Sequence, residues 1–325
     1  MTAHTGSLVG GVDLGGTKIL AAIVDEENRV LGRAKASTPA QEGGPAILAT
    51  IAGSLRLAAA EAGVAISDLK GIGVGSPGPL DPERGVILFS SNLNVKDFAL
   101  GPELSAELGP PVLLRNDVRV GGYGEYILGA GRGKSSVLVA FVGTGIGGCV
   151  ILDGKIVDGS TGNAGELGHI MLKPGGPRCG CGRRGCMEAF ASRTAIAKRI
   201  RKAHRNGRTT SLASKVNDRS DKLKSKDLAA AYHAGDSVTV SEVHRAAYYL
   251  GLGLGSLVNV LGPERVIIGG GVTAALGPAY LDAIRNSARN QILVDANDKI
   301  DIVMSALGDD SGILGASLMA REAFA

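Results

Sequence analysis

Three of the four cysteines stand close together in a glycine-rich stretch. Cys179, Cys181 and Cys186 lie within eight residues, and His169 precedes them by ten residues in the sequence GELGH. Three thiolates and one imidazole are a typical ligand set for tetrahedral, structural Zn²⁺. A cluster of free thiols is the alternative, and an iron–sulfur cluster suits a set containing histidine less well. Cys149 stands alone and is predicted to be a small packed residue.

Carboxylates and an amide stand where side chains can reach a ligand. Asn116 and Asp117 follow the apolar segment PPVLL, so we expect them to project from the carboxyl end of a strand. Glu166 lies three residues before His169, and Glu188 lies two after Cys186. A metal that holds the histidine and the thiols would therefore position both glutamates. Each acid by itself would more often be a capping or surface residue.

Two glycine-rich turns contain hydroxyl groups. The first reads DLGGTK from Asp13 to Lys18, with Gly15, Gly16 and Thr17 at its centre. The second reads GTGIGG from Gly143 to Gly148, including Thr144, Gly145 and Gly147. Glycines let backbone N–H groups approach a polyphosphate closely, and Thr and Lys donate to phosphate oxygens. Each turn alone could be structural. Neither is a P-loop, and β-like residues follow the glycines, which excludes a Rossmann turn.

A third glycine cluster, Gly269 to Gly271, follows the apolar segment RVII. Gly270 and Gly271 could let an adenine and ribose lie against the backbone, although a plain strand-to-helix turn explains them as well.

The elements that must position these residues fall into two similar halves. LVGGVDLGGTKILAAIVDEENRVLG and SSVLVAFVGTGIGGCVILDGKIVDG share the order strand, glycine turn, strand, polar turn, strand. This symmetry predicts a duplicated α/β unit. Helices are expected at 45–62, at about 240–261 and at the C-terminus, the last capped by Asp310 or Ser311. The predicted domains are 1–118, joined by the helix 310–325, and 119–309 with the cysteine loop.

Composition narrows the class of protein. The chain has 325 residues, 44% hydrophobic and 20% charged, which indicates a globular protein of about two domains. Eleven aromatic residues without Trp, and a net charge of +4, argue against a nucleic-acid partner. The one dense basic run, Lys198 to Arg208, contains six Lys or Arg. We expect a solvated helix face here rather than the alternative, an anion site.

No membrane or export segment is expected. The first residues lack a basic region followed by an apolar one, and the longest apolar stretch, 248–261, is shorter than the roughly 20 residues that a bilayer span needs. A cytoplasmic, reducing location is therefore predicted, in which the cysteines need a reason other than disulfides.

The motifs DLGGTK, SPGP, ND, GTGIGG, GELGH, CGCGRRGCME and GGGV, in this order, resemble the ROK family of sugar kinases and regulators, and within it the bacterial ATP-dependent glucokinases. The resemblance covers nearly the whole chain. It implies a two-domain, actin-like (ribonuclease-H-like) fold with sugar and ATP in the cleft between the domains, and a homodimer or homotetramer. It also implies phosphorylation of a hexose 6-hydroxyl, with glucose first and N-acylhexosamines or fructose as alternatives.

The resemblance also implies a role for each candidate residue. Asp117 would be the general base. The sugar would be held by Gly78, Asn92, Asn116, Asp117, Glu166, His169 and Glu188. ATP and Mg²⁺ would be held by Asp13, Gly15, Gly16, Thr17, Lys18, Gly143, Thr144, Gly145, Gly147, Gly270 and Gly271. Zinc would be held by His169, Cys179, Cys181 and Cys186, with one imidazole nitrogen on the metal and the other on the sugar.

Some positions depart from the family pattern. Arg115 precedes Asn116, Val118 and Arg119 follow Asp117, and Val95 stands where a Trp is frequent. These differences bear on sugar preference more than on the reaction. The alternative within the family is a sugar-sensing repressor. It would need a DNA-reading module, for which little chain is available before Asp13. A zinc-stabilised binding protein without catalysis is the third reading.

Overall fold

The computed structural model describes residues 7–160, 162, 164–217 and 223–325. Contacts between residues divide the chain into two compact units, 1–129 with 309–325 and 130–308. The boundary expected at 118 and 119 stays a prediction. It coincides with the start of a helix that packs closely on the C-terminal helix, with Gly124 against the Ser311 carbonyl and Gly315 against the Val120 carbonyl.

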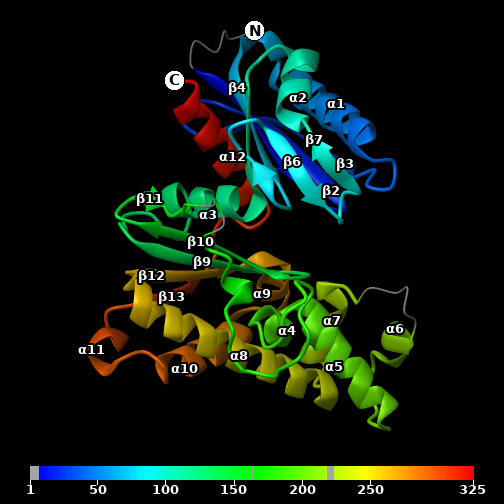
Figure 1. Cartoon of the computed structure of the whole chain (residues 1–325), viewed down its shortest axis with the longest axis vertical. Coiled ribbons are helices and arrows are strands. Elements are labelled where there is room, and N and C mark those ends of the chain that lie inside the picture. Colours follow the sequence, from blue (N-terminus) through cyan, green and yellow to red (C-terminus); the bar gives the residue numbers. More distant parts are fainter. Residues whose placement is uncertain (1–6, 161, 163, 218–222) are drawn as a thin grey trace. The chain divides into compact units, whose positions relative to one another are not determined.

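The first unit contains one large sheet, a small sheet and four α-helices among its described residues (Figure 1). Its elements are β1 (Leu8–Leu14), β2 (Lys18–Val24), β3 (Val30–Ser37), α1 (Gly44–Ala62), η1 (Ile66–Asp68), β4 (Leu69–Ser76), β5 (Leu80–Asp81), β6 (Val86–Ser90), β7 (Val95–Phe98), α2 (Leu100–Leu108), β8 (Val112–Asn116), α3 (Asp117–Ile127) and α12 (Asp310–Ala323).

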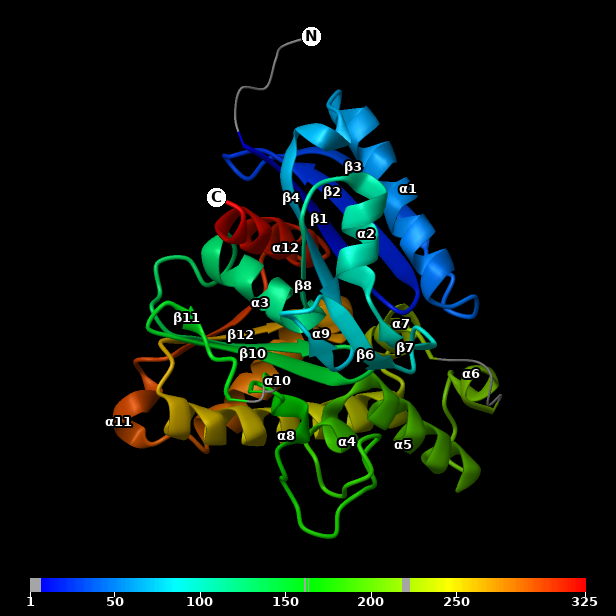
Figure 2. The same cartoon turned by 45° about the horizontal axis from the view of Figure 1, so that its top comes forward.

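The second unit contains one sheet and a larger set of helices (Figure 2). Its elements are β9 (Val137–Val142), β10 (Ile146–Leu152), β11 (Lys155–Ile156), η2 (Leu167–His169), α4 (Glu188–Ala191), α5 (Arg193–Arg205), α6 (Ala213–Asn217), α7 (Ser225–His233), α8 (Ser237–Leu261), β12 (Arg265–Gly269), α9 (Gly270–Leu276), α10 (Pro278–Arg289), α11 (Val294–Asn297) and β13 (Asp301–Met304).

The two large sheets have the same topology. Strand order is β3-β2-β1-β4-β8 in the first unit and β11-β10-β9-β12-β13 in the second. In each, three antiparallel strands are followed by two strands that run parallel to the central one. The duplication predicted from the two similar segments is confirmed, and the paired sheets match the expected actin-like architecture.

Helix α1 covers one face of the first sheet and α12 covers the other. Adjacent residues of a strand point to opposite faces, so neighbouring residues of β1 contact different helices. In β1, Gly10 faces Leu55 of α1, whereas Gly11 faces Ser317 of α12. The backbone of α12 approaches so closely that a Cβ on Gly11 would collide with the Ile313 carbonyl. A glycine is therefore required there for the C-terminal helix to pack on this sheet.

The core of the second unit forms between its sheet and the long helix α8. Leu250 and Leu254 of α8 are fully buried with Ile284 of α10, and α8 runs alongside α10 (Figure 2). Gly251 and Gly255 of α8 lie against backbone carbonyls of α10, so these helices pack at close range. Many of the chain's glycines thus serve close packing between elements.

Predicted elements are confirmed with small corrections. The helices expected at 45–62 and 240–261 are α1 and α8. The C-terminal helix begins at Asp310, and its N-cap residue is Asp309, whose side chain makes no capping hydrogen bond. The predicted cap by Asp310 or Ser311 is therefore wrong, because both lie inside the first turn. Among the described residues, no helix is long and apolar enough to cross a bilayer.

Candidate functional site

The three clustered cysteines and His169 meet in space. Their ligand atoms all lie within 4.8 Å of one another. Sγ of Cys181 is 3.8 Å from Sγ of Cys186, and Sγ of Cys179 is 3.7 Å from Nδ1 of His169. Ligands bound tetrahedrally to Zn²⁺ at about 2.3 Å (S) and 2.0 Å (N) lie roughly 3.5–3.8 Å apart. The group therefore fits a zinc ion, with Nδ1 as the imidazole ligand.

Local backbone geometry builds this metal-ligand group. The 3₁₀ turn η2 presents His169, and the Arg178–Arg184 and Met171–Cys186 bridges fold the loop back on itself. Gly185 has a φ of 83° and lies against the Lys173 carbonyl, where no side chain would fit. Burial raises the pKa of the Cys179 thiol to about 12, so metal binding has to displace a proton from this sulfur.

Glu188 joins the metal-ligand group to the second glycine turn. Its Oε1 accepts a hydrogen bond from the Cys179 thiol at 3.4 Å, and its Oε2 accepts one from the Ile146 backbone N–H at 3.0 Å. Gly145 leaves the space that this carboxylate fills. Glu188 thus links the cysteine loop to the second glycine turn. This structural role was not among the expectations for Glu188, which was assigned only a sugar contact.

The glycine turn between β9 and β10 is held from its other side by the start of α5. Nη2 of Arg193 donates to Oγ1 of Thr144 at 2.7 Å, and Oγ1 of Thr194 donates to the Thr144 carbonyl at 2.7 Å. Nη1 of Arg193 reaches Oγ of Ser225 at 3.2 Å. Burial lowers the pKa of the Arg193 guanidinium. No local sequence pattern marks Arg193, Thr194 or Ser225 as neighbours of this turn, because only the fold brings α5 and α7 to it.

Gly270 and Gly271 lie beside the same turn. Strands β9 and β12 are parallel, with Gly269 paired to Phe141, so both end at one edge of the sheet. Gly270 has a φ of 85°, and a Cβ there would lie 2.6 Å from the Val142 backbone nitrogen. A Cβ on Gly271 would be 3.6 Å from Oγ of Ser225. Gly143 has open space around it, and Gly147 is the second residue of β10.

The first unit repeats this arrangement at its own sheet edge. The turn between β1 and β2 holds Gly15, Gly16 and Thr17, and the Gly15 N–H donates to the Lys18 carbonyl at 2.9 Å. In this hairpin the last paired residues are Leu14 and Ile19, with four residues, 15–18, between them. In the hairpin of the second unit they are Val142 and Ile146, with three residues, 143–145, between them. The two turns are therefore related in topology and differ in detailed geometry.

Asp13 is the last but one residue of β1, the central strand of the first sheet, and its carboxyl group is partly buried against Gly312 near the start of α12. Burial raises the pKa of Asp13; Lys18 opposes this effect, and Asp309 adds to it. Nζ of Lys18 forms an ion pair with Oδ2 of Asp309 at 2.7 Å. The hairpin therefore combines a partly buried carboxylate, Asp13, with Lys18, whose exposed ion-pair partner Asp309 could be replaced by a polyphosphate.

Asn116 and Asp117 lie at this same edge, because β1, β4 and β8 are parallel and end together. Asp13 pairs with Gly75 of β4, and Ser76 of β4 pairs with Asn116. Oδ1 of Asn116 caps α3 by accepting from Val118 N–H at 3.1 Å and Arg119 N–H at 3.2 Å. Asp117 is the first residue of α3, and its Oδ1 accepts from Val118 N–H at 2.9 Å.

Gly78 and Asn92 belong to the segment around the small sheet of the first unit. A Cβ on Gly16 would lie 3.3 Å from Cβ of Asn92, so Asn92 adjoins the first glycine turn. Gly78 has a φ of 106° and packs against the Phe89 carbonyl.

Glu166 is exposed and precedes η2 in the second unit. Cys149 is 1% exposed within β10, as expected of a packed residue.

Known proteins are similar to this chain over nearly its whole length. The model of the ROK family matches residues 9–323. A glucokinase of Halalkalibacterium halodurans is 35% identical over 313 residues, 96% of this chain and 94% of that protein. A solved ROK hexokinase of Thermus thermophilus is 37% identical with a TM-score of 0.81, covering 97% and 98% of the two chains. A solved ROK glucokinase of Streptomyces griseus, in complex with glucose and AMPPNP, is 33% identical with a TM-score of 0.83, covering 97% and 100%.

Proposed function

Because the chain belongs to the ROK family, we propose that it transfers the γ-phosphoryl group of ATP to the 6-hydroxyl of a hexose, glucose being the first candidate. One observation carries the proposal. Parallel strands bring the first glycine turn and Asp117 to one sheet edge, and parallel strands in the second unit do the same for the second turn and Gly270. Phosphoryl transfer needs this combination of an acceptor carboxylate and phosphate cradles.

Asp117 is the general base of the proposed reaction. Its carboxylate takes the proton of the 6-hydroxyl while that oxygen attacks the γ-phosphorus, and the bond from phosphorus to the bridging oxygen breaks to release ADP. The N-terminus of α3 carries a partial positive charge, which favours the ionised form that a base requires. A general base contributes about 10²–10⁴-fold to the rate.

The sugar contacts follow from the side chains that remain available. Since Oδ1 of Asn116 caps α3, its amide nitrogen is the group offered to a hydroxyl. His169 directs Nδ1 toward the thiols, which leaves Nε2 for the sugar. Glu166, Gly78 and Asn92 complete the proposed set, and Glu188 contacts the sugar while it bridges to Ile146.

The nucleotide is assigned to the two hairpins. Backbone N–H groups of Gly15, Gly16, Gly143, Gly145 and Gly147, with hydroxyls of Thr17 and Thr144 and the ammonium of Lys18, face the phosphates in this proposal. Gly270 and Gly271 leave room for adenine and ribose.

Two metals fit the donors that are present. Asp13 supplies the hard oxygen ligand that Mg²⁺ prefers, and Mg²⁺ bound with ATP neutralises phosphate charge. Zn²⁺ suits the three thiolates and Nδ1, where it stabilises the loop that carries His169 and Glu188.

An ADP-release assay with glucose, N-acetylmannosamine, N-acetylglucosamine and fructose tests the function. We expect Asp117→Asn to lower kcat by about 10²–10⁴-fold with little change in sugar binding. Asp153→Asn is the matched control, since Asp153 lies in an exposed turn with a φ of 48° that asparagine also adopts. If the protein binds sugar but releases no ADP from ATP with any of the four sugars, a sugar-responsive regulator would be favoured instead.

A further inference from the structure

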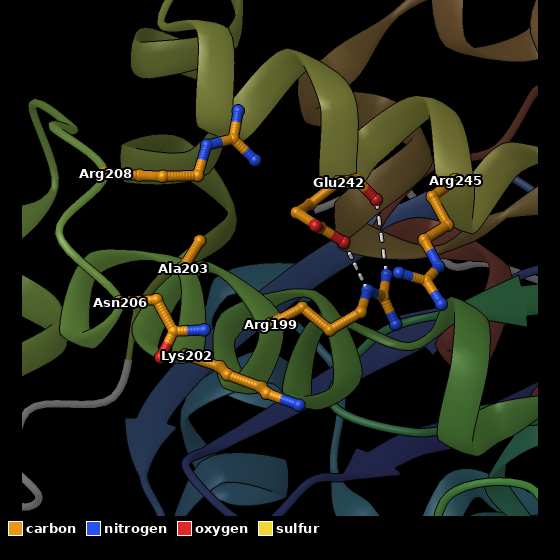
Figure 3. Close-up of a pocket in the computed structure, with 7 residues that line it drawn as sticks. All are labelled: Arg199, Lys202, Ala203, Asn206, Arg208, Glu242 and Arg245. Carbon is orange, nitrogen blue, oxygen red and sulfur yellow. Dashed lines mark hydrogen bonds and ion pairs between the residues drawn. The ribbon is translucent and has the colours of Figure 1, made fainter.

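The basic run, predicted to be a solvated helix face with an anion site as the alternative, lines a pocket in the second unit. The pocket holds about 240 Å³ and lies between α5, the segment after it, and α8 (Figure 3). Four cationic side chains, one carboxylate, one amide and one methyl group line it: Arg199, Lys202, Arg208, Arg245, Glu242, Asn206 and Ala203.

The single carboxylate of this basic pocket is already neutralised. Nε of Arg199 donates to Oε2 of Glu242 at 2.6 Å, and Nη2 of Arg199 donates to the Glu242 carbonyl at 3.2 Å. Nη1 of Arg199 donates to the Phe190 carbonyl at 2.7 Å. Only 17% of the Arg199 side chain and 11% of the Glu242 side chain are exposed. This pair forms a fixed floor that leaves no acid for the other cations.

The backbone brings a further cation back over the helix end. Gly207 has a φ of 87°, a left-handed conformation that reverses the chain after α5. The Arg208 N–H then donates to the Ala203 carbonyl at 3.1 Å, and Nδ1 of His204 lies 3.4 Å from the Arg208 carbonyl. The helix-ending turn therefore places Arg208 at the pocket lined by Lys202, on the opposite side of it from Lys202 (Figure 3).

Three cations of the pocket lack an acidic counterpart in the described part of the chain. No hydrogen bond or ion pair of the Lys202, Arg208 or Arg245 head groups occurs among these residues. Figure 3 shows the guanidinium of Arg245 next to that of Arg199. Burial lowers the pKa of Arg199, the hydrogen bond and charge of Glu242 raise it, and the nearby charge of Arg245 lowers it again, so a second cation lies next to the Arg199–Glu242 pair.

We propose that this basic pocket binds a phosphate-class oxyanion, either inorganic phosphate or the phosphoryl group of a small metabolite. Guanidinium groups donate in a planar fork that matches phosphate oxygens, and an anion would pair with the Arg245 charge that Glu242, already bound to Arg199, leaves over. The volume is below the roughly 300–1,000 Å³ of pockets for larger organic ligands, which favours a small ion or group. The site is separate from every residue assigned to the proposed reaction.

Calorimetric titration of inorganic phosphate into the intact protein tests this site. The titration is made with hexose and a non-hydrolysable ATP analogue at saturation, so that the proposed nucleotide site is filled. We expect one binding event that weakens about tenfold or more in Arg208→Gln and in Arg245→Gln, because each removes a charge-assisted contact. Arg205→Gln, an exposed change on the same helix outside the pocket, should bind as the wild type does.

The same titration distinguishes inorganic phosphate from a phosphorylated metabolite, and a defined site from diffuse surface charge. Tighter binding of a sugar phosphate than of inorganic phosphate identifies a metabolite, and equal binding identifies the free ion. Loss of all phosphate binding once the nucleotide site is filled overturns the proposal. So does equal weakening in Arg205→Gln, which would indicate diffuse surface charge. Unchanged melting temperatures of Arg208→Gln and Arg245→Gln exclude misfolding as the cause of weaker binding. The comparison of variants holds whether or not the protein proves to be a kinase.

Discussion

Arg193 donates a hydrogen bond to the Thr144 hydroxyl at 2.7 Å, which fixes the tip of the second glycine turn to the first residue of α5. Thr194 adds a second bond to the Thr144 carbonyl. The turn that we assign to ATP phosphates is therefore preorganised by a cation, and this charge itself favours a nearby polyphosphate.

Replacing Arg193 by Gln should raise the KM for ATP about 10–100-fold, because the lost charge-assisted hydrogen bonds are worth about 1.5–3 kcal/mol. The KM for the sugar should change little. Steady-state kinetics with each substrate varied in turn measures the difference. Arg201→Gln, on the same helix but bonded to the Val216 carbonyl, is the control. Equal losses for both substrates would point to a general structural role instead.

Replacing Cys181 by Ser should remove the bound metal, because it takes one soft ligand from the Cys₃His set. We expect zinc content to fall from about one per chain to well below one, with at least a tenfold loss of kcat/KM for the sugar as His169 and Glu188 lose their support. Elemental analysis and kinetics measure both effects. Cys149→Ala should keep its zinc, since Cys149 lies outside the set. Full activity of a zinc-free protein would contradict the structural role.

Stability should fall in acid partly through Asp236. Burial raises the pKa of this carboxyl, but hydrogen bonds from the Ser211 and Thr239 N–H groups outweigh it and lower the pKa to about 2. A lowered pKa in the folded state contributes stability above the ordinary value near 4, and this contribution is lost as pH falls toward 2. Asp236→Asn should therefore show a shallower decline between pH 4 and 2 in urea unfolding than the wild type. An unchanged slope, matching Asp153→Asn, would refute this.

Tyr280→Phe should stabilise the protein by about 1 kcal/mol, since the change removes a hydroxyl that is fully buried. Among the described residues, this hydroxyl has no hydrogen-bond partner. Burial raises the pKa of Tyr280, so the group stays protonated. Chemical denaturation measures the change. Tyr248→Phe, at an exposed site, should alter the free energy of unfolding by less than about 0.5 kcal/mol. Destabilisation by Tyr280→Phe would reveal a bound water.

Much of the fold could be predicted because its signals are local. Alternation of apolar residues around Gly15 and Gly145 defined both hairpins, and the similarity of the two segments indicated duplicated sheets. Cysteine spacing likewise predicted the metal-ligand group, since three of its ligands lie within one loop.

What sequence reasoning missed depends on contacts between distant segments. Nothing near Arg193 or Ser225 in the sequence marks them as neighbours of Thr144, because the packing of α5 and α7 brings them there. The double role of Glu188 was missed for the same reason. Asn116 could have been recognised as a cap, since Asn followed by an acidic first helical residue is a common helix start.

The return of α12 to the first sheet affects the order in which the nascent chain can mature. Gly11 and Gly73 lie against the backbone of α12, so the unit formed by residues 7–129 lacks a covering layer until residues 309–325 have left the ribosome. Residues 130–308 emerge earlier and contain their own core. Vectorial synthesis would therefore complete the unit of residues 130–308 before the unit whose strands precede it in the chain, the reverse of the usual N-to-C order of domain folding.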